Sequence, residues 1–247
     1  MRRILLTAIV ALVVVSSGCV GLITGETVEF EANNATVEED ARSSAGYELN
    51  NSSEQSITRD VEFLGQERTI RIVNQVSRYT SGGSLADVVD SETLPENETL
   101  PEDERLAENE TLQQEIENET SSDTQVADLK QFIVVSSPGA KVAGQTLNPA
   151  ASWSSDRILE QVADQTGQLD DIESDGSRNA ESLGDEREVS EFTATTELKG
   201  QEIDVRLHVV SFEHEGDVVI AVGAHPEEID EEENVDELLE GIEHNGN

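Results

Sequence analysis

Alternating apolar and polar residues along the chain predict several β-strands, each bounded by turn-forming residues. A hairpin is predicted from Val61 to about Tyr79, because Gly65 supplies a tight turn between two apolar arms. The same reasoning predicts strands at Thr27 to Ala32, Gln131 to Ser136, Phe192 to Leu198, Ile203 to Phe212 and Asp217 to Gly223. Apolar runs of this kind argue against a disordered chain.

Apolar residues at helical spacing predict helices among these strands. Thr36-x-x-Glu39 has the form of a capping box that opens the first helix. Ser154 or Ser155 is expected to cap a second helix, with Trp153 as a hydrophobic staple after the turn at Asn148-Pro149. The apolar positions are Val37, Ala41 and Ala45 in the first helix, Ile158, Leu159 and Val162 in the second, and Val235, Leu238, Leu239 and Ile242 near the end of the chain.

Helix, hairpin and third strand follow one another twice, and a shift of 135 residues superimposes Gly65 on Gly200 and Arg71 on Arg206. We therefore expect an α+β fold, an antiparallel sheet packed with helices and built by internal duplication. The predicted organisation is a single domain over 28–247, with two pseudo-repeats at about 28–80 and 128–247. A disordered, acidic, flexible insert at 81–127 interrupts this domain.

The net charge predicts a strongly acidic surface. With 54 Asp plus Glu against 15 Lys plus Arg, the formal charge is −39. Nucleic-acid binding is excluded, because it requires clustered basic residues. A carboxylate-rich surface that stays hydrated in molar salt favours a halophilic protein, and an acidic protein from a non-halophile is the alternative.

The N-terminus has the pattern of an export signal. Arg2 and Arg3 precede the uncharged run Ile4 to Val15, and Gly18-Cys19 resembles the end of a lipoprotein lipobox. We expect residues 1–18 to be a signal peptide, Cys19 to be lipidated, and residues 19–27 to tether the domain to the cell membrane. Ser16 stands where a lipobox usually has Leu. An uncleaved anchor from Ile4 to Ile23 is the alternative, and Sec and twin-arginine export both remain open.

Asn-x-Ser/Thr sequons are more frequent than composition predicts, which indicates a glycosylated surface protein. They occur at Asn34, Asn50, Asn51, Asn97, Asn109 and Asn118. The last three lie in the acidic insert, within a repeated Glu-Asn-Glu-Thr sequence. Composition bias of that tract is the alternative explanation.

The residues that could carry chemistry form no complete motif. His208 and His214 flank a predicted hairpin, and strand alternation could place them on one face, but no Cys and no His-x-x-x-His spacing accompanies them to form a zinc site. Asp171 to Gly176 imitates the first half of an EF-hand loop, yet Ser182 stands where the final acid is needed, so an acidic surface loop is expected. No metal, cofactor or catalytic residue is predicted. Trp153 is the one candidate for contact with a ligand or partner, although a core position is more usual for such a residue.

Two resemblances accompany these patterns. Phe192 to Gly223 with the closing helix resembles the PsbP-like sandwich of photosystem extrinsic proteins and exported lipoproteins. The whole chain resembles an uncharacterised family of haloarchaeal lipoproteins. That second resemblance rests on Gly18-Cys19, Ser136 to Gly139, Gly144-Gln145, Asn148-Pro149, the Gly200 hairpin, and Val218 to Gly223 ending in Pro226. This second resemblance implies a haloarchaeal host and a location at the extracellular face of the membrane. It implies no activity.

The predicted function is that of a lipid-anchored, extracytoplasmic surface protein of a halophile. Its partners would be the membrane, through the anchor, and an unidentified protein; the role would be partner binding or a place in the envelope, without catalysis. A binder of a small or apolar ligand in a groove near Trp153 is the alternative. An enzyme is the least favoured hypothesis.

Overall fold

The computed structural model describes residues 27–63, 65–81, 130–142, 145–166, 169–198 and 201–245. Eight strands form one large mixed sheet with the order β1-β4-β5-β11-β10-β9-β8, and β3 pairs with β4 beside this path. These strands are β1 (Val28–Glu31), β3 (Glu48–Phe63), β4 (Gln66–Thr80), β5 (Gln131–Pro138), β8 (Asp170–Ser182), β9 (Asp185–Leu198), β10 (Gln201–His214) and β11 (Asp217–Pro226).

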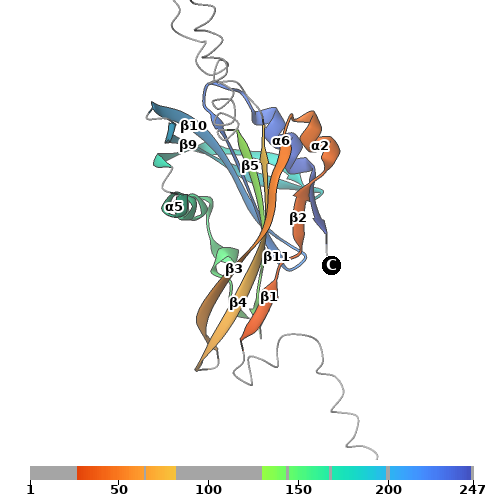
Figure 1. Cartoon of the computed structure of the whole chain (residues 1–247), viewed down its shortest axis with the longest axis vertical. Coiled ribbons are helices and arrows are strands. Elements are labelled where there is room, and N and C mark those ends of the chain that lie inside the picture. Colours follow the sequence, from red (N-terminus) through yellow and green to blue (C-terminus); the bar gives the residue numbers. More distant parts are fainter. Residues whose placement is uncertain are drawn as a thin grey trace, which may run out of the picture.

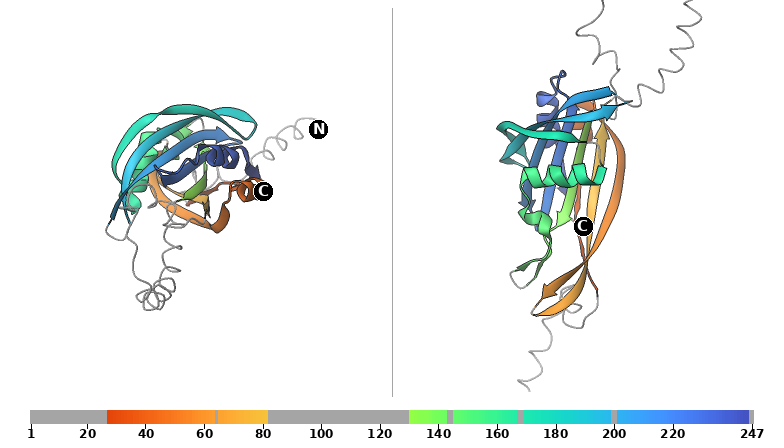
Figure 2. Two further views of the ribbon diagram at one scale, coloured as in Figure 1. Left: turned by 90° about the horizontal axis from the view of Figure 1, so that it is seen from above. Right: turned by 90° about the vertical axis from the view of Figure 1, so that its left-hand side faces the viewer.

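Two small sheets and short helices complete the described part of the chain. The small sheets pair β2 (Asn34–Val37) with β12 (Ile242–Asn245), and β6 (Lys141–Val142) with β7 (Gln145–Thr146). The helices are α2 (Glu39–Ser44), α5 (Ser155–Thr166) and α6 (Glu232–Glu240), with the 3₁₀ turn η1 (Pro149–Ser152) before α5. In Figure 1, α5 lies on one side of the sheet and α2 and α6 lie on the other. Figure 2 shows that the sheet is strongly twisted and curves around α6.

The predicted α+β fold class was wrong, because the chain is mostly β and is built around this one mixed sheet. The sheet is not purely antiparallel either, since β1 pairs with β4 in parallel. The prediction lacked all of the long strand β8 and most of the long strand β3, of which it contained only the end that forms the hairpin. β3 begins at Glu48, well before the predicted hairpin, and β8 occupies the segment predicted to be an acidic surface loop.

The remaining predicted strands and the second helix are confirmed, while the other two helices begin or end at different residues. Helix α5 begins at Ser155, and Ser154 caps it by accepting a hydrogen bond from the Arg157 N–H (3.4 Å). The expected capping box is wrong, because Thr36 lies in β2 and α2 begins only at Glu39. The pattern near the end of the chain is divided between α6 and β12, which begins at Ile242.

Strand β11 is the centre of the core, because its alternating side chains enter two separate hydrophobic clusters on opposite faces. Val219 and Ala221 pack in one cluster with Leu238 of α6, whereas Val218 and Ile220 pack in the other with residues of α5. Complete burial of a side chain such as Leu238 contributes about 1.5–3 kcal/mol. The core is thus one sheet covered on both faces, with β3 and β8 left as solvent-exposed edges.

Strand β4 sets the long axis of the domain. Along one side it pairs with β3 over its whole length, and along the other it pairs first with β1 and then with β5. Val28 is aligned with Ile70, close to the hairpin turn at Gly65. At the far end of β4, the Ser81 N–H donates to the Lys130 carbonyl (3.1 Å). Ser81 and Lys130, the described residues on either side of 82–129, therefore lie side by side at the end of β4 opposite to β1.

Candidate functional site

All four histidines of the chain meet in two pairs, and each pair includes one residue of β10. His208 stacks on His225, with ring centroids 5.2 Å apart, and His214 meets His244 edge to face at 5.3 Å. The sequence suggested that His208 and His214 share a face of their strand. It gave no indication of their partners, which lie on β11 and β12.

Hydrogen bonds determine which nitrogens carry protons in the buried pair of His208 and His225. His225 Nδ1 lies 2.8 Å from the Pro226 carbonyl oxygen, so it donates. In a neutral ring, His225 Nε2 is then an acceptor, and His208 Nε2, 3.0 Å away, donates to it. His208 Nδ1 is left unprotonated. It is buried and has no hydrogen-bond partner among the described atoms.

The surroundings keep His208 neutral. Burial lowers its pKa to about 3, and His225, Arg178 and Arg206 act in the same direction. Burial also lowers the pKa of His225. Glu191 Oε1 is 3.6 Å from His208 Nδ1, but this carboxylate is already bound by Arg178 Nε at 3.2 Å. Both rings are only 2% exposed, so this pair has a structural role in the core.

Arg178 connects three elements around the buried pair. From β8 it binds Glu191 of β9 and Asp236 of α6, and Glu232 of α6 lies 3.7 Å away. The Arg178 side chain is only 14% exposed. Because its guanidinium offers several donors in a fixed plane, one side chain can hold α6 against the edge of the sheet.

A second cluster, at the C-terminal end of β10, has the composition of a metal site. His214 ends β10, Glu215 follows it in the turn, and His244 comes from β12. One potential ligand atom from each of these three residues lies within 4.8 Å of the other two. Two imidazoles and a carboxylate suit zinc and related divalent metals.

His244 is oriented by a buried carboxylate. Its Nε2 lies 3.2 Å from Asp217 Oδ2 and 3.3 Å from Ser136 Oγ. Asp217 is 5% exposed and also accepts a hydrogen bond from the Asn33 N–H at 2.8 Å. With Nε2–H donated to Asp217, Nδ1 of the neutral ring is unprotonated, and Glu215 Oε2 lies 3.9 Å from it. This Nδ1 is buried and unpartnered among the described atoms.

The turn that carries Glu215 is tightly fixed. Glu215 and Gly216 have φ values of 49° and 95°, which match the type I′ turn of a two-residue hairpin. Asn or Gly is the usual first residue of such a turn, and a glutamate there has a left-handed backbone. The Gly139 N–H donates to the Gly216 carbonyl at 2.9 Å, and a Cβ on Gly139 would come within 2.6 Å of that oxygen. Gly139 is therefore required for this close approach.

A further buried ion pair lies where residues 82–129 join the fold. Lys130 binds Glu231, which is 3% exposed and also accepts a hydrogen bond from Asn234 (2.9 Å). The Tyr47 hydroxyl lies 3.4 Å from the same carboxylate, and burial followed by the charge of Glu231 raises the Tyr47 pKa. Among the described residues, Asp217 and Glu231 are the two carboxylates in the buried class.

The sequence-predicted site residues are dispersed over the structure. Trp153 is half-buried at the end of η1 and packs against the cluster that contains Ile158 and Leu159. Asn34, Asn50 and Asn51 are exposed, the first on β2 and the other two at an irregularity of β3. Cys19, Asn97, Asn109 and Asn118 lie outside the described residues. The EF-hand-like segment is a bulged part of β8, and its Asp175 binds Arg206 at 3.0 Å.

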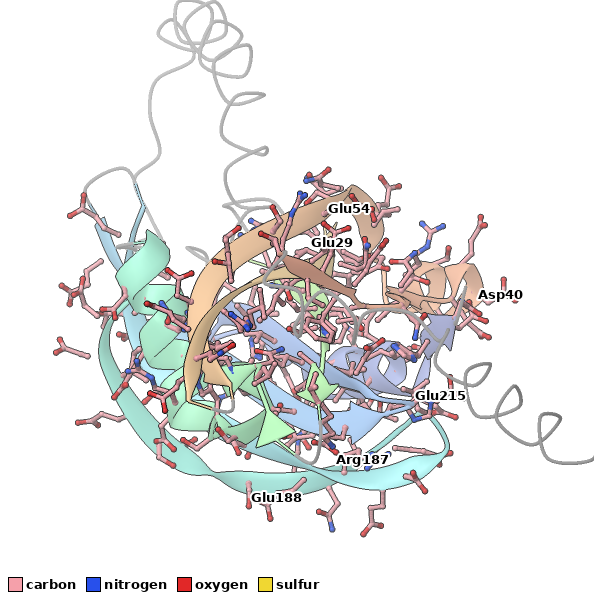
Figure 3. The ribbon with its side chains drawn as sticks, turned by 90° about the horizontal axis from the view of Figure 1, so that it is seen from below. Glu29, Asp40, Glu54, Arg187, Glu188 and Glu215 are labelled. Atoms are coloured by element: carbon pink, nitrogen blue, oxygen red, sulfur yellow. The ribbon has the colours of Figure 1, made fainter. Side chains whose placement is uncertain are left out.

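Acidic side chains cover the exposed faces of the described fold. Figure 3 shows Glu29, Asp40, Glu54 and Glu188 pointing outward from four different elements. Within the described ranges, no helix has both the length and the apolar content needed to cross a membrane.

Comparison with known proteins identifies a family without an assigned activity. The chain matches the family described as Domain of unknown function (DUF6517) over residues 34–243, which include all of the sheet except β1. A search of curated proteins found no match. The match includes His208, His214 and His225 and ends one residue before His244. Because it covers most of the chain, the chain belongs to the DUF6517 family.

Proposed function

We propose that this protein is a lipid-anchored, extracytoplasmic surface protein of a halophile, with a non-catalytic role in partner binding or in the envelope. The charged, apolar and small-residue segments of residues 1–18 and the following Cys19 support export and anchoring. The resemblance to haloarchaeal lipoproteins supports the same host and location.

The observation that carries this proposal is where two points of the chain lie along the sheet: one near each end of strand β4. Val28 is aligned with Ile70, near one end of β4, whereas Ser81 and Lys130 meet at its other end. A strand rises about 3.3 Å per residue, so the 11 residues from Ile70 to Ser81 separate these points by roughly 35 Å along β4. A chain tethered through Cys19 would thus have its anchored end and the junction of residues 82–129 at opposite ends of the fold.

In a chain tethered through Cys19, the two ends of the fold along β4 would have different environments. Residues 19–27, even fully extended, span at most about 30 Å, so the β3–β4 turn would stay near the membrane surface. The junction of the acidic segment that carries Asn97, Asn109 and Asn118 would then face away from the membrane. An arrangement that presents a sequon-bearing segment outward is suited to a displayed surface protein.

The charge distribution supports the halophilic environment. The acidic side chains of the described fold are mostly exposed, while the two buried carboxylates have partners: Glu231 is paired with Lys130, and Asp217 accepts hydrogen bonds from His244 and the Asn33 N–H. A surface of this kind stays hydrated, and its self-repulsion is screened when the Debye length falls to about 3 Å in molar salt. Glycosylation at the exposed Asn34, Asn50 or Asn51 is part of the same proposal.

Fractionation of cells that produce Cys19→Ser tests the anchor. We expect the wild-type chain in the membrane fraction and Cys19→Ser in the soluble extracytoplasmic fraction, because the variant has no thiol for lipid attachment. Ser17→Ala, which changes a neighbouring small residue and keeps the thiol, is the matched control and should remain membrane-bound. Recovery of Cys19→Ser entirely with membranes would contradict lipid anchoring.

A further inference from the structure

We propose that His214, Glu215 and His244 form a binding site for a divalent transition-metal ion, with Zn²⁺ as the expected metal. This inference is independent of the membrane anchor, because it rests only on residues of the folded sheet. The set provides two imidazole nitrogens and one carboxylate oxygen, and the three ligand atoms lie within 4.8 Å of one another. In a tetrahedral site with bonds of about 2.1 Å, ligand atoms are about 3.4 Å apart. Small side-chain rotations therefore suffice to close the site.

The strongest evidence is the unpartnered nitrogen of His244. The His244 side chain is fully buried, and its Nδ1 has no hydrogen-bond partner among the described atoms. A buried polar atom left unpaired is costly. The distance of 3.9 Å from this Nδ1 to Glu215 Oε2 is too long for a hydrogen bond but close to the separation of two ligands on one metal. A metal ion between them would satisfy both groups.

Asp217, which contacts the other ring nitrogen of His244, also supports a metal site here. Asp217 accepts from His244 Nε2 and is itself held by the Asn33 N–H. Metal-binding histidines commonly donate their second N–H to a carboxylate, which fixes the tautomer that leaves the other nitrogen free to bind. Asp217 is therefore a positioning residue, since it acts through His244.

The site would join two sheets. His214 and Glu215 belong to the β10–β11 hairpin of the large sheet, whereas His244 lies on β12, which within the described part of the chain pairs with β2 in a separate small sheet. A metal ion bound by all three residues would cross-link these parts and would stabilise the folded state as its concentration rises. Three protein ligands leave a fourth position for water.

Calorimetry with Zn²⁺ alone, in molar KCl with excess Mg²⁺ to occupy surface carboxylates, tests the proposal. The full chain would carry Cys19→Ser, so that no thiol competes for the metal. We expect one equivalent of Zn²⁺ to bind, and Glu215→Gln and His214→Gln each to weaken binding at least tenfold. Glu213→Gln is the matched control, because Glu213 is a neighbouring exposed carboxylate that binds Lys141 instead (2.7 Å). It should leave Zn²⁺ affinity unchanged.

Substitution by Co²⁺ gives a second readout, since bound Co²⁺ should show the visible absorption of a tetrahedral or five-coordinate site, and Glu215→Gln should diminish it. His214 is half-buried and Glu215 is exposed, so the His214→Gln and Glu215→Gln variants should still fold. Absence of stoichiometric Zn²⁺ binding would overturn the proposal. So would equal weakening by Glu213→Gln and Glu215→Gln, or displacement of Zn²⁺ by equimolar Ca²⁺.

Discussion

Asp217 Oδ2 lies 3.2 Å from His244 Nε2, so a buried carboxylate at the start of β11 fixes a histidine of the last strand. The same oxygen accepts the Asn33 N–H, which joins the segment before β2 to this contact. One side chain thus connects the small β2–β12 sheet to the large one. Its removal should affect both the stability of the fold and the orientation of His244.

Asp217→Asn should destabilise the protein by about 1–3 kcal/mol, because the amide cannot reproduce the charge-assisted hydrogen bonds of the buried carboxylate. Denaturant unfolding in molar KCl would measure this change. Asp60→Asn is a suitable control, since Asp60 is exposed and accepts one hydrogen bond from Thr69 (2.7 Å). Equal free energies of unfolding for the two variants would contradict the structural importance of Asp217.

Protonation of His208 should destabilise the fold. Its pKa is lowered from 6.5 to about 3 by burial, so between these pH values the unfolded chain binds a proton that the folded chain does not. The stability contribution is complete above pH 6.5 and is lost as the pH falls, at up to about 1.4 kcal/mol per pH unit. The titratable and charged groups that face His208 are His225, Arg178, Arg206 and Glu191.

His208→Gln tests this dependence, because the glutamine amide can still donate to His225 Nε2 but does not titrate. The variant should lose less stability than the wild type between pH 6.5 and 4, measured by denaturant unfolding at constant salt. The NMR shift of the His208 ring should also remain that of a neutral imidazole over this range. A ring that titrates near its ordinary pKa would refute the assignment.

Arg178→Met should cost about 3 kcal/mol, because it removes a largely buried cation and leaves the largely buried Glu191 carboxylate, as well as the partly exposed Asp236, without its partner. The matched control is Arg157→Met on α5. Arg157 pairs with Glu160 at 2.8 Å, and both side chains are more than half exposed, so the change should stay within about 0.5 kcal/mol. Thermal unfolding of both variants at one salt concentration would show whether burial makes this difference.

Dilution of salt should destabilise the wild-type protein. Its formal charge of −39 produces strong self-repulsion once the Debye length rises to about 10 Å at 0.1 M salt. Melting curves in KCl from molar to physiological concentration should show a falling Tm. A Tm that stays constant or rises on dilution would argue against the halophilic proposal.

The sequence predicted those elements whose apolar pattern is set by burial. The confirmed strands β5, β9, β10 and β11 have side chains buried on at least one face, so their periodicity was visible. Strands β3 and β8 are edge strands with mostly exposed side chains, so polar residues are tolerated on both faces and the pattern disappears. This loss of signal led to the wrong fold class.

The wrong start of the first helix, predicted at Thr36, has a tertiary cause. Thr36 pairs with Glu243 of β12, and the Val37 N–H donates to the buried Tyr79 hydroxyl at 2.7 Å. These long-range contacts favour a strand over the local capping box. Strand β12 is also what brings His244 to His214 and Glu215. Because this approach depends on β2–β12 pairing, no local spacing in the sequence could have indicated the metal-site geometry.

Mass spectrometry of the N-terminal peptide from native membranes measures whether Cys19 is the lipid-bearing first residue of the mature chain. We expect a peptide that begins at Cys19, lacks residues 1–18 and carries the mass of lipid. A membrane-extracted chain that retains residues before Cys19, or that begins there with an unmodified thiol, would contradict the proposed anchoring.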